Sequence, residues 1–173
     1  MATLLITPPG NAVHRDFFSV GGVDIPEDAE MEFSTAVGIV KVRPDFMFPH
    51  LALLEALPGS VPVGSVDLRI ISATVPPSNV VPITVTAGPA PALRILQTGE
   101  AKTRPYTIAF VANPAIESAS GVKFGPDPIL TNRPGFQNLV LHGLRNLFQV
   151  TEDLLRQHDF HARVRIISIF DPT

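Results

Sequence analysis

The sequence predicts an α+β protein in which a β-rich region, built as a sandwich or a barrel, precedes a strand–helix–strand (βαβ) unit. Short apolar segments separated by Pro- and Gly-containing turns fill residues 1–100, as in sandwiches and small barrels. After that, the pattern changes to one continuous apolar run, one long helical period and a final strand. We therefore divide the chain into a β-rich region, 1–100, and a βαβ unit, 101–173.

The strands of the first region are predicted from β-branched and aromatic residues bounded by turn formers. Gly21-Gly22 offers a two-residue turn after the second strand. The segment around Gly38 is either one strand with a bulge at that glycine or a hairpin. Residues 50–57 form a helix-like patch of about two turns that ends at Pro58-Gly59. The predicted strands cover residues 3–7, 12–20, 30–43, 66–75, 80–86 and 93–97.

The βαβ unit begins with a nearly continuous apolar run, 106–112, which fits a strand covered on both faces. A helix over 136–157 has apolar residues at three- and four-residue spacing, with Asn132 as its N-cap and Pro134 in its first turn. The last strand covers 162–170, and we expect it to run parallel to the first, with a right-handed crossover. This helix can cover one face of the sheet only. The other face needs the N-terminal strands, a second copy of the chain or a further segment.

The composition favours assembly over nucleic-acid or membrane binding. Apolar residues make up 45% of the chain and charged residues 17%, which is below the roughly 25% typical of soluble domains. Apolar surface left over from the core most simply implies a homo-oligomer or a protein partner. The net charge is −3 and no basic run occurs, so we expect no nucleic-acid partner and no binding to anionic membranes.

Cysteine is absent, which excludes disulfides, thiolate catalysis and cysteine-ligated metals. The N-terminal residues have no positively charged region and only a short apolar run, so they do not resemble a signal peptide. No apolar stretch reaches the length of a membrane helix. We therefore expect a soluble, cytoplasmic protein.

Ligands of open α/β sheets bind beyond the carboxyl ends of the strands. The long 113–135 loop follows the first strand of the βαβ unit and leads to the N-terminus of its helix, where an anion is favoured. A small acidic or phosphorylated ligand near Arg133 would fit this arrangement. The alternative is that these side chains only form turns or stay solvated. The predicted ligand-binding residues are Asn113, Glu117, Asp127, Arg133 and Asp171.

Catalytic and metal motifs are weak. Glu117 with Asp127 or Asp171 would supply paired carboxylates for acid–base chemistry, but nothing in their spacing requires them to meet. The sequence contains no Gly-x-Ser-x-Gly elbow and no phosphate-binding loop. His158 and His161 lie where the predicted helix ends. A protonated histidine there would interact favourably with the negative end of the helix dipole. We expect no metal and no cofactor.

The leading hypothesis is therefore a non-catalytic assembly or binding module that acts through self-association or a protein partner. One alternative is the N-terminal part of a split or larger α/β enzyme, hydrolase-like, with its site at the 113–135 loop. A second alternative is a protein that binds a small anionic ligand. The apolar cluster Phe46-Met47-Phe48 fits core packing, and it would also suit an anchor for a partner.

Overall fold

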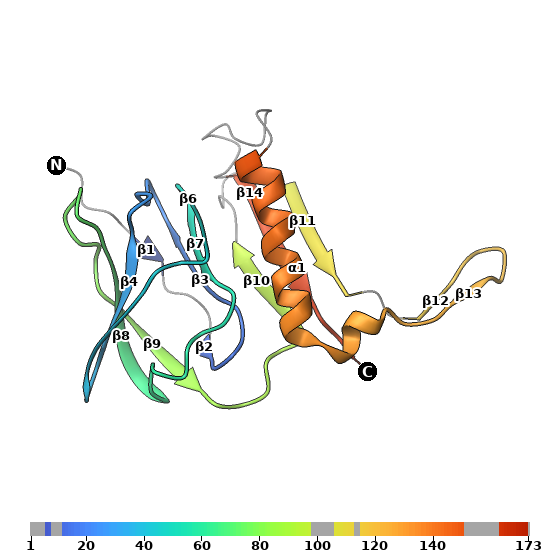
Figure 1. Ribbon diagram of the computed structural model, residues 1–173, viewed down its shortest axis with the longest axis horizontal. Coiled ribbons are helices and arrows are strands. Elements are labelled where there is room, and N and C mark those ends of the chain that lie inside the picture. The colour runs from blue at the N-terminus through green and yellow to red at the C-terminus, as the bar shows by residue number, and fades with distance from the viewer. Residues whose placement is uncertain (1–5, 8–11, 98–105, 113–114, 151–162, 173) are drawn as a thin grey trace.

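The computed structural model describes residues 6–7, 12–97, 106–112, 115–150 and 163–172. Figure 1 shows a β-sandwich on the left, a sheet with one helix in front of it on the right, and a hairpin that projects beyond them. The prediction of a mostly β protein with one late helix is confirmed, and none of the sheets closes into a barrel.

Two sheets form the sandwich. The middle sheet contains, in spatial order, β1 (Ile6–Thr7), β3 (Phe18–Gly22), β7 (Leu51–Leu54) and β6 (Phe46–Phe48). The flank sheet contains β2 (Ala12–Val13), β9 (Val81–Thr86), β8 (Gly64–Ile71), β4 (Glu30–Thr35) and β5 (Gly38–Val42). All neighbours pair antiparallel except β2 and β9, which are parallel.

The sandwich forms because alternate residues of both sheets are apolar and meet in one core. Phe18 and Val20 of β3 face Phe33 and Leu68 of the flank sheet, and all four are buried. The strand order corresponds to strands A-B-E-D and A′-G-F-C-C′ of an immunoglobulin-type sandwich. The inter-sheet disulfide of antibody domains is absent, because the chain has no cysteine.

The predicted helix over 50–57 is wrong, because Leu51–Leu54 form strand β7. All four residues are buried, since β7 is a central strand with a layer on each face. Ala52 and Leu54 face the sandwich core, whereas Leu51 and Leu53 face the second core under the helix. A strand that is buried on both faces loses its alternation and cannot be told from a short helix by periodicity.

The predicted turn at Gly21-Gly22 lies elsewhere, and the predicted strand 12–20 is interrupted. Strand β3 continues through Gly21-Gly22, and the chain turns after them, where Asp24 has φ 55°. The predicted strand 12–20 is divided into β2 and β3 at Arg15, which has φ 61°. Of the two alternatives for 30–43, the hairpin is observed, and Gly38, at φ +142°, starts its second strand.

The two strands of the βαβ unit and a strand that was assigned to the β-rich region form a three-stranded sheet, which we call the helix-backed sheet. Its order is β10 (Leu93–Gln97), β14 (Val164–Ile169), β11 (Tyr106–Val111). Strands β11 and β14 are parallel, as predicted, and β10 joins β14 antiparallel. Helix α1 (Arg133–Arg145), capped by Asn132, lies in front of this sheet between β10 and β11 in Figure 1 and continues as a π-helical turn, Asn146–Val150.

The second core joins the middle sheet, α1 and the inner face of the helix-backed sheet. Phe46 and Phe48 of β6 are buried here, and Phe48 stacks on Phe148 at 5.1 Å between ring centroids. The core-packing interpretation of the Phe46-Met47-Phe48 cluster is therefore correct. Gly143 lets α1 approach the sheet closely, because a Cβ at this position would lie 2.5 Å from the Phe110 ring.

The predicted loop 113–135 contains more structure than expected. Strands β12 (Ile116–Glu117) and β13 (Lys123–Phe124) form a hairpin, and a 3₁₀ turn, Pro128–Thr131, precedes α1. This hairpin projects from the body of the molecule in Figure 1. Its short strands carry too little periodicity to be recognised in the sequence.

Candidate functional site

The outer face of the helix-backed sheet, turned away from α1, consists of aliphatic side chains. Within the three strands, residues that point to α1 alternate with residues that point outward, so the pairing register identifies the outer set. The two rows across the sheet are Ile95–Ile167–Ala109 and Leu93–Ile169–Val111. We call these six residues the open face.

The open face is exposed to solvent. Leu93, Ile95 and Val111 are 50%, 51% and 50% exposed, which is high for large aliphatic residues side by side. Ile167 and Ile169 are half-buried by their neighbours in the sheet. Parallel strands are almost always covered on both faces, and contiguous apolar patches on soluble proteins mark interaction sites. The described residues leave the face opposite α1 uncovered.

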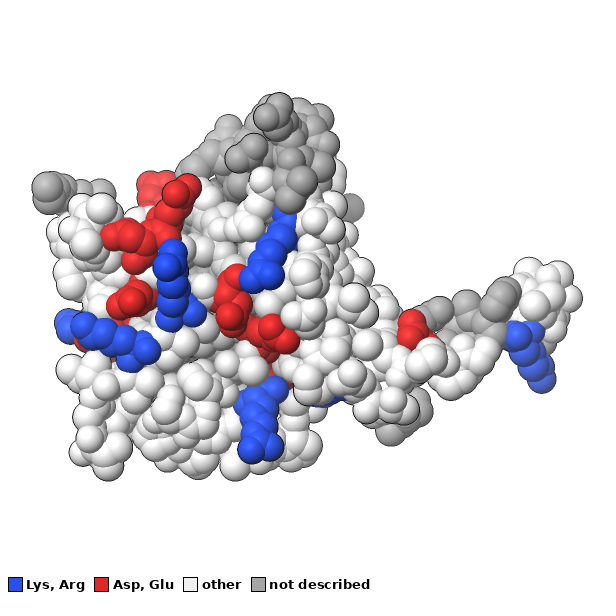
Figure 2. Space-filling view, viewed as in Figure 1, with Lys and Arg blue, Asp and Glu red and all other residues white. Residues whose placement is uncertain are grey.

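The six residues of the open face are all uncharged. The side of the molecule seen in Figure 2, on which α1 lies, carries acidic and basic groups over the sandwich and its junction with the helix. On β14 the outward-pointing basic residue is Arg165, which lies at the start of the strand and donates to the Thr107 hydroxyl. Arg165 therefore lies at one end of the open face and not within it.

A buried ionic cluster joins the sandwich to the βαβ unit. Asp16 is fully buried between β2 and β3, and its carboxylate accepts from Arg94 Nε of β10 at 2.5 Å. Arg133 and Gln137 of α1 donate to its other oxygen, each at 3.3 Å. Arg133 also donates to the Pro91 carbonyl at 2.7 Å. These contacts hold the sandwich, the sheet and the helix in one arrangement.

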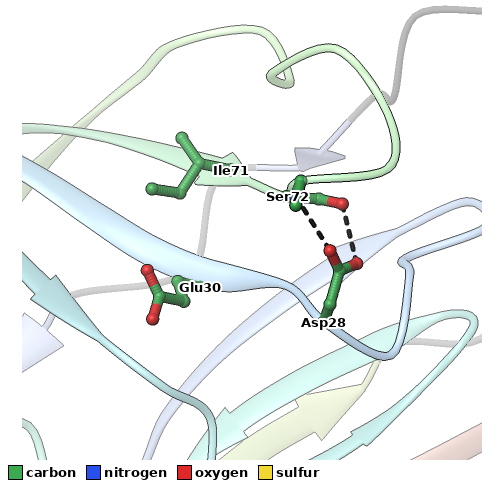
Figure 3. Close-up of a pocket in the computed structure, with 5 residues that line it drawn as sticks. Asp28, Glu30, Ile71 and Ser72 are labelled. Atoms are coloured by element: carbon green, nitrogen blue, oxygen red, sulfur yellow. Dashed lines mark hydrogen bonds between the residues drawn. The ribbon is translucent and has the colours of Figure 1, made fainter.

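A pocket of about 390 Å³ lies on the sandwich, between the segment before β4 and the end of β8 (Figure 3). Asp28 lines it and accepts from the Ser72 hydroxyl and the Ala73 amide. The Ser72 hydrogen bond, ahead of all other contributions, holds the pKa of Asp28 below its ordinary value. Glu30 lies apart from Asp28 in Figure 3. Because Asp28 already binds the chain itself, this pocket is best explained as a stabilised turn.

Four of the five predicted ligand-binding residues lie within the described structure. Asp127 caps the 3₁₀ turn by accepting from the Ile129 amide at 2.8 Å. Arg133 lies on Asp16, with its guanidinium 5.1 Å from the centroid of the Phe170 ring. Asp171 is exposed after β14, and Glu117 lies in the projecting hairpin. Asn113 lies outside the described residues, as do His158 and His161.

The roles of Asp16, Arg94 and Gln137 were not evident from the sequence, because their contacts join residues far apart in the chain. The open face was anticipated only in general form, as a sheet face without a cover. The alternation of Leu93 and Ile95 around the inward-pointing Arg94 was visible in the sequence. The strands that lie beside this segment in the sheet could not be read from it.

The comparisons with known proteins give no family. No family model matches the sequence, and no curated protein is similar to it. Among the described residues, no helix is both long and apolar enough to cross a membrane. The same residues include no group of three or more His, Asp or Glu side chains arranged to hold a metal ion.

Proposed function

We propose that the protein is an assembly module that binds another protein surface through the open face. The observation that carries the proposal is the exposure of Leu93, Ile95 and Val111, each about half exposed in one continuous aliphatic surface. Fully burying a large aliphatic side chain is worth about 1.5–3 kcal/mol, so covering the exposed half of each contributes about 1 kcal/mol. Three such residues, with Ile167 and Ile169 beside them, form a suitable centre for an interface.

The rigid support of this face favours the same function. The ionic cluster of Asp16, Arg94 and Arg133 fixes the sheet on the sandwich, and α1 covers the inner face. A preorganised surface loses little conformational entropy when it binds. The enzyme and anion-binding hypotheses lack a comparable observation, since Asp127 and Arg133 are engaged within the chain.

The absence of cysteine allows a direct test by thiol labelling. Ile95→Cys places one thiol on the open face, and Ile39→Cys is the matched control, because Ile39 is 61% exposed on strand β5 of the flank sheet. We expect both thiols to react with a maleimide at similar rates in dilute purified protein. In concentrated protein, or with the partner present, the thiol of Ile95→Cys should be protected and that of Ile39→Cys should not.

A second pair of variants tests the binding energy. Leu93→Lys and Ile39→Lys each add a lysine to an exposed strand, but only the first requires the partner to desolvate a charge. We expect Leu93→Lys to weaken association at least about tenfold, whereas Ile39→Lys leaves it unchanged. Circular dichroism checks that both variants fold. Equal labelling of the two thiols under all conditions would exclude the open face as a binding site.

A further inference from the structure

The open face carries opposite charges at its two ends. On β14, Arg165, Ile167 and Ile169 point outward, and Asp171 continues the same parity after the strand. Phe170, between the last two, is buried on the inner side, and its amide donates to the Ala92 carbonyl at 2.7 Å. Arg165 and Asp171 are both exposed. The stripe formed by β14 and the exposed Asp171 after it is therefore basic, aliphatic, aliphatic, acidic.

This stripe is complementary to the same stripe of a second copy whose strands run in the opposite direction. At about 3.3 Å per residue, Arg165 and Asp171 lie roughly 20 Å apart, with Ser168 midway between them. A second copy, laid face to face with its strands reversed, brings each Arg165 opposite Asp171 of the partner subunit. It also brings Ile167 opposite Ile169 of the partner subunit.

The two rows of the open face have the same symmetry. Reversal about the level of Ser168 exchanges the row that contains Ile167 with the row that contains Ile169. Ile95 then meets Leu93 of the partner subunit, and Ala109 meets Val111 of the partner subunit. Each contact pairs aliphatic side chains, and the small Ala109 leaves room for the larger valine.

We propose that the open face binds a second copy of this chain about a two-fold axis that lies in the interface, at the level of Ser168. The two middle strands run antiparallel across the interface, and both ends are closed by Arg165–Asp171 ion pairs. This inference rests on the proposed function and names its partner. The self-complementary charges favour a second copy over a helix or peptide, because neither of those needs opposite charges at the two ends.

Charge reversal tests the proposal. Arg165→Asp alone places two acids at each end of the symmetric interface, and Asp171→Arg alone places two bases there. Changing an exposed attraction into a repulsion of similar size, at both ends, weakens association roughly 30-fold in low salt. When the two variants are mixed, each end again joins one acid to one base, so the mixed pair should associate as tightly as wild type.

Sedimentation equilibrium of each variant, of the mixture and of the double variant R165D/D171R measures these constants. Arg43→Asp is the control for an acidic replacement outside the interface, since Arg43 is exposed beyond the flank sheet. We expect association at the wild-type level for Arg43→Asp, for the mixture of Arg165→Asp with Asp171→Arg, and for the double variant. High salt should reduce every difference between variants.

The outcomes separate this inference from the proposed function. If the thiol of Ile95→Cys is protected by concentration but charge reversal has no effect, the open face is used and the two-fold arrangement is wrong. If protection requires a different molecule, the second copy is wrong and the occupant is another protein. If that thiol is never protected, the proposed function itself fails.

Discussion

The replacement Asp16→Asn tests the ionic cluster that joins the two halves of the molecule. Asp16 is fully buried, and it faces Arg94 and Arg133, whose side chains are 14% and 24% exposed. The substitution keeps the size of the side chain but removes the charge that the two guanidinium groups face. Removing one partner of a buried ion pair costs about 3–5 kcal/mol. Because both arginines retain some contact with water, we expect a loss near the lower limit, about 3 kcal/mol.

The assay is urea unfolding followed by far-UV circular dichroism, with linear extrapolation to water. Asp67→Asn is the matched control, because Asp67 is exposed on β8, and it should change the free energy of unfolding by no more than about 0.5 kcal/mol. Arg94→Gln and the double variant with Asp16→Asn complete a thermodynamic cycle. The double variant should lose at least about 1.5 kcal/mol less than the sum of the single losses.

A loss below about 1 kcal/mol for Asp16→Asn, or additive losses in the cycle, would refute this explanation. Either result would mean that water replaces the carboxylate at little cost. The junction would then be held by the second aromatic and aliphatic core alone, around Phe48 and Phe148.

Two further predictions concern the helix contact and the stabilised turn. Gly143→Ala should destabilise the protein by about 1 kcal/mol, because overpacking against the Phe110 ring costs more free energy than the gain in helix propensity supplies. In a Phe110→Leu background the same replacement should become stabilising, because the ring is no longer there. Urea unfolding measures both, and a gain in the wild-type background would contradict the predicted clash. Asp28→Asn should lower stability near neutral pH, because the pKa of Asp28 is lower in the folded than in the unfolded chain. That stabilisation is lost as the pH falls through the folded pKa, so the variant and wild type should converge in acid; a difference that persists there would exclude the carboxylate as its source.

The sequence predicts the parts of the fold that have clear periodicity. Helix α1 and strand β14 were located because their apolar residues follow one period over many residues, whereas β11 was located as a nearly continuous apolar run. Leu51–Leu54 were misassigned because the strand lies between two apolar layers, and local sequence does not contain the second layer. The expectation that the helix covers one face of the sheet agrees with the position of α1 on the inner face.

The contacts that define the candidate site were harder to predict, because they depend on pairing. Asp16 lies 78 residues from Arg94 and 117 from Arg133, and nothing near it in the sequence indicates burial of a carboxylate. Likewise, the open face exists only when three strands separated in the chain are placed in register. Arg133 was singled out for a real reason, its position at the start of a helix, but its guanidinium binds a carboxylate of the same chain.

The ionic cluster also explains why the aliphatic residues of β10 point outward. A slip of β10 by one residue would turn Leu93 and Ile95 toward the core and Arg94 toward solvent. Burying the exposed halves of the two aliphatic side chains would contribute about 2 kcal/mol. The slip would also remove Arg94 from the buried Asp16, at a cost near the lower limit of about 3 kcal/mol, since Arg133 remains beside the carboxylate. The second effect is larger, so a buried carboxylate in the sandwich selects the register that keeps an apolar surface exposed on the opposite face of the sheet.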